Sequence, residues 1–145
     1  MPTATFPDWF AAQNFRHFTA PEFTRYFAAT RNGVTNSPPP PDLWKNIVPT
    51  LRIVDSMRER FGNPITILSS YRSPAYNRAV GGARFSQHVE FTALDITVAK
   101  ATPLEVFTLL KSWRSQGLFK GGLGLYQHSG FVHIDTRPEN ATWED

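Results

Sequence analysis

Four consecutive prolines, Pro38 to Pro41, interrupt the chain well before its middle. Such a run favours an extended polyproline conformation and offers no backbone N–H, so neither a helix interior nor a sheet can continue through it. It is too short to link two domains, and the residues before it are too few to form a core of their own. We therefore predict an N-terminal helical arm with a proline-rich connector (1–41) and a main domain (42–145), within one structural unit.

The composition is that of a globular domain with a real core. The 145 residues are 41% hydrophobic and include 12 phenylalanines, while charged residues make up only 19%. This balance is unlike that of an intrinsically disordered chain. Because the chain has no cysteine, disulfides and thiolate metal sites are excluded, and any metal must be bound by His, Asp or Glu.

Charge and hydropathy exclude several classes of partner. The net charge of +3 and the pI near 9.5 are mildly basic, but there is no Lys/Arg run of the kind that binds nucleic acid. No apolar stretch reaches the roughly 18 residues that span a bilayer. The residues Met1 to Thr5 lack the basic and apolar regions of a signal peptide. We expect a soluble protein with no nucleic-acid partner and no membrane insertion.

Helical signals come first along the chain. Thr19 to Glu22 has capping-box spacing with Pro21 in the first turn, which predicts a helix in the arm before a break at 31–33. From Asp42 to about Phe61, apolar residues recur at the helical period and Gly62 follows, which predicts a long amphipathic helix. Pro49 is expected to kink or restart that helix.

Strand signals dominate the second half of the chain. The segments 64–69, 93–98, 121–126 and 131–135 are typical of strands, and the last two form a hairpin. A short helix at 73–80 follows the first strand, and a capping box from Thr102 to Glu105 opens another helix that ends near Gly117. This order predicts a single α+β domain with a small antiparallel-rich sheet flanked by helices.

Two of these strands carry polar side chains on one face. In 131–135, Val132 and Ile134 point to one side while His133 and Asp135 point to the other. Asp95 likewise alternates with apolar neighbours in 93–98. The two strands can therefore present Asp95 and His133 on a common polar face, with His88 approaching from the preceding loop.

Two imidazoles and one carboxylate are the donor set of a catalytic zinc site, in which water takes the fourth position. Bound water then becomes acidic enough to react near neutral pH. The spacing alone also fits a simpler interpretation, in which His133 is a structural residue of the strand and Asp95 ends a turn.

The surrounding motifs favour the metal site. They occur in one order along the chain: Ser70-Tyr71-Arg72-Ser73-Pro74, Asn77, Gly81-Gly82-Ala83, Ser86-x-His88, Ala93-x-Asp95-Ile96, Gly122-x-Gly124-x-Tyr126 and Phe131-Val132-His133-x-Asp135. From about Leu43 to Asp135 the sequence resembles the zinc D-Ala-D-Ala metallopeptidase superfamily. This superfamily includes wall carboxypeptidases, murein endopeptidases and phage endolysins, and it is related to the hedgehog signalling-domain fold.

The resemblance implies a role for each matching residue. His88, Asp95 and His133 match the ligands of one zinc ion. Arg72 matches an arginine beside the substrate, which can bind a carboxylate or a developing oxyanion; the alternative is a structural salt bridge. The remaining matches imply that Ser86 and Tyr126 contact substrate, although Ser86 also fits an ordinary turn serine.

The sequence departs from the family pattern at two positions. Where the family usually has glycine, three residues after the first histidine, this chain has Phe91, which is expected to reshape the loop or narrow the cleft. Where many relatives carry the acidic general base, three residues before the last histidine, it has Gly130. Asp135, Glu90 and His128 are the candidate replacements, and we rank Asp135 first. Asp135 can instead orient a ligand imidazole.

The function implied is zinc-dependent hydrolysis of peptidoglycan stem peptides or cross-links, by a carboxypeptidase or a murein endopeptidase of endolysin type. The alternative is a non-catalytic wall-binding or virion structural module that retains the fold. The expected place of action is the bacterial cell wall, and the sequence leaves its location otherwise unknown. Without a visible signal peptide, release through a holin, carriage on a phage virion and export by another route all remain open. The arm is expected either to cover the core or to dock on a partner.

Overall fold

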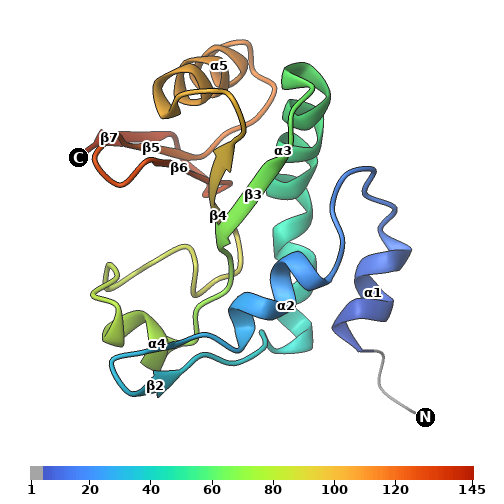
Figure 1. Cartoon of the computed structure of the whole chain (residues 1–145), viewed down its shortest axis with the longest axis vertical. Coiled ribbons are helices and arrows are strands. Elements are labelled where there is room, and N and C mark those ends of the chain that lie inside the picture. Colours follow the sequence, from blue (N-terminus) through green and yellow to red (C-terminus); the bar gives the residue numbers. More distant parts are fainter. Residues whose placement is uncertain (1–4) are drawn as a thin grey trace.

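The computed structural model describes residues 5–145 (Figure 1). Residues 1–4, and with them most of the segment on which the signal-peptide expectation rests, lie outside it. The elements follow in this order: α1 (Phe6–Ala12), α2 (Pro21–Phe27), β1 (Thr30–Arg31), β2 (Val34–Thr35), the 3-10 helix η1 (Pro41–Ile47), α3 (Val48–Phe61), β3 (Ile65–Ser69), α4 (Pro74–Ala79), β4 (Ala93–Val98), α5 (Pro103–Ser115), β5 (Gly122–Tyr126), β6 (Phe131–Asp135) and β7 (Ala141–Glu144).

The main sheet has the strand order β3-β4-β6-β5-β7. Every neighbouring pair is antiparallel except β5 and β7, which run parallel. The α+β class with an antiparallel-rich sheet is thus confirmed. The sequence did not predict β7, a short strand that follows a turn and pairs with the far side of the β5–β6 hairpin.

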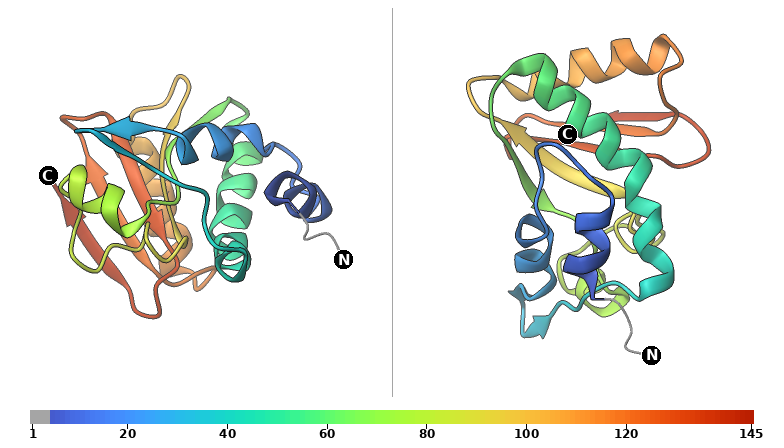
Figure 2. Two further views of the ribbon diagram at one scale, coloured as in Figure 1. Left: turned by 90° about the horizontal axis from the view of Figure 1, so that it is seen from below. Right: turned by 90° about the vertical axis from the view of Figure 1, so that its right-hand side faces the viewer.

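Helices α3 and α5 cover one face of this sheet, as the two views of Figure 2 show. Leu94 and Ile96 of β4 and Val132 and Ile134 of β6 point towards them, together with Leu123 and Leu125 of β5. Together they form most of the core, which includes Leu51, Val54, Met57, Leu94, Ile96, Val106, Phe107, Leu110, Val132 and Ile134. The opposite face of the same strands is left for polar side chains.

The long helix expected from Asp42 is two helices in succession. The 3-10 helix η1 ends at Ile47, and α3 begins at Val48 with Pro49 in its first turn. Proline is tolerated there because the first N–H groups of a helix have no partner within it. Helix α3 ends at Gly62, whose φ of 70° is the left-handed conformation that glycine adopts without a Cβ clash.

The N-terminal arm packs its aromatic side chains into the main core. Helix α1 was not predicted as a separate helix; Thr5 caps it by accepting a hydrogen bond from the backbone N–H of Asp8. Phe6, Phe23 and Phe27 are buried, and each contacts Phe91 through a tilted or edge-on ring; Phe6 also contacts Trp44. Of the two expectations for the arm, the structure shows it covering the core.

A polar clamp fixes the arm to α3. The Asp55 carboxylate accepts hydrogen bonds from the backbone N–H groups of Arg16 and His17, at 3.1 and 3.0 Å. One turn further along, the Glu59 carboxylate lies 2.9 Å from the His17 imidazole and 3.0 Å from the Arg16 guanidinium. The hydrogen bond from His17 and the positive charge of Arg16 lower the pKa of Glu59.

The Glu59→Gln variant tests the electrostatic share of this clamp. Because the pKa of Glu59 is lowered in the folded protein, its contribution is complete above the ordinary glutamate pKa and is lost as the pH falls. We expect the variant to melt below the parent at pH 7, by no more than about 3 °C since the pair is exposed. The two melting temperatures should converge as the pH is lowered through the folded-state pKa of Glu59. A difference that does not shrink on acidification would mean that the ionised carboxylate is not responsible.

The break predicted at 31–33 is a tight hairpin. Strands β1 and β2 pair through Thr30 with Thr35 and Arg31 with Val34, and both turn residues, Asn32 and Gly33, have positive φ. Among the residues described, no helix is long and apolar enough to cross a membrane.

Candidate metal centre

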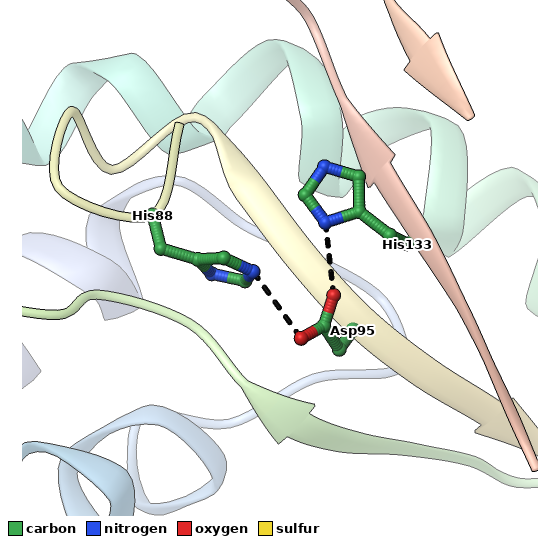
Figure 3. Close-up of side chains that lie close together, drawn as sticks. All are labelled: His88, Asp95 and His133. Atoms are coloured by element: carbon green, nitrogen blue, oxygen red, sulfur yellow. Dashed lines mark hydrogen bonds and ion pairs between the residues drawn. The ribbon is translucent and has the colours of Figure 1, made fainter. Parts of the chain in front are cut away.

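Strands β4 and β6 bring an aspartate and a histidine directly opposite each other. Their antiparallel register pairs Asp95 with His133, and both side chains lie on the face turned away from α3 and α5. His88 reaches the same point from the loop before β4 (Figure 3). One ligand atom from each of the three residues lies within 4.8 Å of the others, and all three residues are buried.

The orientation of His88 is fixed by backbone groups. Its Nδ1 lies 2.7 Å from the Ser70 carbonyl oxygen, which can only accept, so Nδ1 carries the proton. The His88 carbonyl in turn accepts a hydrogen bond from the backbone N–H of Arg72. The lone pair of Nε2 is therefore directed towards the other two donors. Nε2 lies 3.2 Å from Asp95 Oδ2, yet it has no hydrogen-bond partner among the residues that the structure describes.

His133 lies between two carboxylates. Its Nε2 is 2.7 Å from Asp135 Oδ2, and its Nδ1 is 3.0 Å from Asp95 Oδ1. Burial lowers the pKa of the imidazole, but the hydrogen bonds and charges of Asp135 and Asp95 outweigh it and raise the pKa of His133. For Asp95, burial raises the pKa, and His88 and His133 reverse this to hold the pKa well below its usual range.

The arrangement fits a metal ion with nitrogen and oxygen ligands. His88 Nε2, His133 Nδ1 and an Asp95 oxygen converge from three separate segments, and a buried imidazole nitrogen without a partner is costly unless a ligand satisfies it. The other nitrogen of each imidazole is held by a backbone carbonyl or a carboxylate, as is usual for metal-binding histidines. The assignment of these three residues as ligands stays a prediction.

Asp135 lies behind His133 and does not line the cleft. It is fully buried, and Arg137 donates to both of its carboxylate oxygens while the backbone N–H of Gly122 donates to Oδ1. Burial raises the pKa of Asp135, but the bonds from His133 and Arg137 outweigh it, and the pKa lies well below its usual range. This geometry supports the orienting role and argues against our first-ranked role for Asp135, that of a proton acceptor.

A cleft of about 470 Å³ opens in front of the three donors. Its wall includes all the other residues that the sequence singled out for substrate contact, namely Arg72, Ser86 and Tyr126. Ser86 also accepts a hydrogen bond from the backbone N–H of His88 at 3.2 Å. The hydroxyl of Tyr126 accepts one from the Trp143 indole at 2.8 Å. Their roles in substrate binding remain predictions.

Arg72 extends over the metal donors. Its Nη2 lies 3.7 Å from Asp95 Oδ2, and its side chain is 17% exposed. Asn77 accepts a hydrogen bond from Nη1, and the hydroxyl of Tyr26 accepts one from Nε. A Cβ at Gly82 would lie 2.0 Å from the Asn77 side-chain oxygen and 2.9 Å from Arg72 Nη1, so only glycine leaves room for this pair.

Neither of the other candidate bases reaches the cleft. Glu90 does not line it, and His128 is exposed, with its Nδ1 3.7 Å from Asp145. Gly130 has a φ of 82° and open space around the position of a Cβ. Phe91 does not narrow the cleft as expected, because its ring is buried among the aromatic side chains of the arm.

Two residues of this site were missed in the sequence. Arg137 follows the β6 motif and holds Asp135, and its guanidinium lies 5.2 Å from the ring of Trp143. Trp143 lies on β7, with its ring centroid 5.1 Å from that of His133. A Cβ at Gly124 would lie 2.4 Å from the indole nitrogen, which explains a glycine in that strand. Arg137 could have been found from its position two residues after Asp135. No local feature of the sequence indicated that Trp143 belongs to the site.

A larger cavity lies elsewhere, between α3 and the α5 segment. It measures about 620 Å³, is mostly apolar, and is lined by residues such as Ile53, Trp113 and Phe119. None of the metal donors borders it. The smaller cleft therefore remains the candidate active site, since it combines depth with convergent polar groups.

Comparisons with known proteins identify a relative and a family. Over 85 residues the chain is 32% identical to a Haemophilus influenzae protein named as a probable peptidoglycan L,D-endopeptidase, MepK; the match covers 55% of this chain and 42% of that protein. The chain thus matches less than half the length of this relative. No solved structure gives a significant match. The family model for Peptidase M15 matches residues 16–135, from the arm to the end of β6, and the chain belongs to the Peptidase M15 family.

Proposed function

We propose that this protein is a zinc-dependent peptidase that hydrolyses peptide bonds in the stem peptides or cross-links of peptidoglycan. The observation that carries the proposal is the buried, unpartnered Nε2 of His88, directed at Asp95 and His133 in the floor of a cleft. Family membership supports a peptidase, and the name of the relative supports a peptidoglycan substrate and an endopeptidase over a carboxypeptidase.

His88, Asp95 and His133 would hold the zinc ion. When bound, the ion supplies Lewis acidity for the scissile carbonyl and lowers the pKa of a coordinated water. Asp135 accepts a hydrogen bond from the Nε2–H group of His133. The lone pair of Nδ1 is thereby left free to bind the metal, and the ring is fixed in its plane. Arg137 holds Asp135 in place from the other side.

Arg72 is the residue proposed to bind the substrate. Its guanidinium enters the cleft beside Asp95, where it can pair with a peptide carboxylate or with the oxyanion that forms on the scissile carbonyl. Because burial weakens competition from water, such a pair is stronger here than on an exposed surface. Ser86 and Tyr126 offer hydroxyl groups along the same wall.

The second candidate function is a non-catalytic wall-binding or structural module. The observation in its favour is that, among the residues described, Asp95 is the only carboxylate lining the cleft, so no side chain there is an evident base for a bound water. The cost of keeping three buried donors aimed at one point argues for a functional centre.

The test uses metal-free protein reloaded with one equivalent of zinc. We expect tight binding of one ion and release of new peptide fragments from purified muropeptides, detected by mass spectrometry. Removal of zinc with a chelator should abolish cleavage, and readdition should restore it. Stoichiometric zinc binding with no cleavage of any muropeptide would favour the non-catalytic module, and absence of zinc binding would reject the metal centre itself.

A further inference from the structure

One buried side chain of the arm bonds to the backbone on both sides of Arg72 and to the backbone of α2. Asn36 lies directly before the serine and proline run and is only 5% exposed. Its amide nitrogen donates to the carbonyl of Tyr26 at 3.1 Å and to that of Tyr71 at 2.8 Å. Its amide oxygen accepts from the backbone N–H of Ser73 at 2.9 Å. With the amide turned over, its oxygen would face both carbonyls, so only this orientation satisfies all three backbone groups.

These bonds hold Arg72 by the peptide groups on either side of it. Tyr71 and Ser73 are its chain neighbours, and the N–H of Arg72 itself donates to the His88 carbonyl at 3.1 Å. The segment has no strand or helix partner of its own, because β3 ends at Ser69 and α4 begins at Pro74. The Asn36 side chain therefore supplies backbone hydrogen bonds that a neighbouring strand would otherwise give to these residues.

The arm also reaches the guanidinium end of Arg72. The hydroxyl of Tyr26, on α2, accepts a hydrogen bond from Arg72 Nε at 3.4 Å, and the Tyr26 ring lies edge-on to that of Tyr76 at 5.8 Å. The same tyrosine supplies the carbonyl that Asn36 binds. One arm residue thus contacts Arg72 directly, and the other contacts both of its neighbours.

We propose that Asn36 is a positioning residue for Arg72, and that through Asn36 and Tyr26 the N-terminal arm is part of the catalytic scaffold as well as a cover for the core. The inference rests on the proposed function for its effect on turnover. Its structural content, that these two residues fix the Arg72 side chain, is testable in the metal-free protein without any substrate.

The first experiment measures the Nε–Hε signal of Arg72 by nitrogen-15 NMR in the metal-free protein, assigned by its loss in Arg72→Lys. We expect the Asn36→Ala variant to shift and broaden this signal and to lower the melting temperature by about 5–10 °C, since three backbone groups that are buried or partly buried lose their partner. Tyr26→Phe, which removes one hydroxyl, should shift the signal while the protein stays folded.

The second experiment measures kcat/KM of the zinc-loaded protein on the muropeptide that the parent cleaves. Displacement of a substrate-binding group is expected to lower kcat/KM by roughly 10–100-fold in Asn36→Ala, and by about 2–5-fold in Tyr26→Phe. If Asn36 acts through Arg72, the two effects are not additive. Asn36→Ala in an Arg72→Lys background should then lower kcat/KM by less than about a further twofold.

Thr102→Ala is the matched control. Thr102 caps α5 far from the cleft, so its loss destabilises the protein without touching Arg72. An unchanged Arg72 signal in both arm variants, or a drop in kcat/KM equal to that of Thr102→Ala at matched stability, would overturn the inference. If Asn36→Ala does not fold, the signal in Tyr26→Phe decides. If the parent cleaves nothing, the proposed function fails, and the NMR result still decides the role of the arm.

Discussion

Replacing Asp95 by asparagine is expected to lower peptidase turnover by at least about 10³-fold, since the residue is one of three proposed metal ligands and such groups act as a unit. The carboxylate lies between the two imidazoles, with oxygens 3.2 Å from His88 Nε2 and 3.0 Å from His133 Nδ1. An amide of the same shape keeps the packing but removes the one negative charge among the three donors. Zinc affinity should fall with turnover, and both are measurable, by competition with a chelating dye and by fragment release.

The matched control is Asp42→Asn, the same change at an exposed carboxylate at the start of η1. It should leave zinc affinity and turnover within about twofold of the parent, as surface changes remote from a site generally do. Turnover of Asp95→Asn within tenfold of the parent would contradict the three-donor centre. Unchanged zinc affinity would place the metal elsewhere.

Removing the side chain of Phe91 is expected to cause the largest loss of stability. The ring is fully buried and contacts Phe6, Phe23, Phe27 and Tyr71. Phe→Ala changes of this kind cost about 3–5 kcal/mol, which is a large share of the total stability of a domain. Phe91→Ala should therefore lower the free energy of unfolding, measured with urea, by that amount and loosen the arm.

The backbone at Phe91 adds a sharper expectation. Its φ is 58°, a left-handed conformation that side-chain-bearing residues adopt at a cost and glycine adopts freely. Phe91→Gly should therefore be more stable than Phe91→Ala by about 1 kcal/mol, the reverse of the usual order. Phe85→Ala, at a ring that is 85% exposed, is the control and should change stability little. An alanine variant as stable as the glycine variant would contradict the strained backbone.

The positive φ at Phe91 also gives a physical reason for the glycine that the family usually has at this position. This chain keeps the conformation and offsets its strain by burying the phenylalanine ring against the arm. The sequence showed the substitution but not which way the phenylalanine ring points. The ring turns away from the cleft towards residues more than 60 positions earlier.

Local signals predicted the strands that carry the site. Alternation in 93–98 and 131–135 placed Asp95 and His133 on a polar face, and the observed β4 and β6 have those bounds. The capping box at Thr102 likewise predicted where α5 begins. These features depend on neighbours within a few residues, which is the range over which periodicity and capping are informative.

Features made by distant pairing were not predictable in this way. Strand β7 is short and is stabilised by β5, so its own sequence carries little strand signal. Asn36, before a serine and prolines, is typical of a turn, and its buried role depends on partners 10 to 37 residues away. The orienting role of Asp135 was among the predictions, but its choice over the role of base needed the structure, which shows the carboxylate fully buried behind His133.

Two of the three proposed metal ligands, Asp95 and His133, lie on the face of β4 and β6 that is opposite the hydrophobic core. Leu94 and Ile96 alternate with Asp95, and Val132 and Ile134 flank His133. A slip of one residue between β4 and β6 would exchange the two faces and bury the donors in the interior. The packing that folds the protein thus also sets the distance between these two side chains. The precision of the proposed centre is inherited from the most deeply buried part of the molecule.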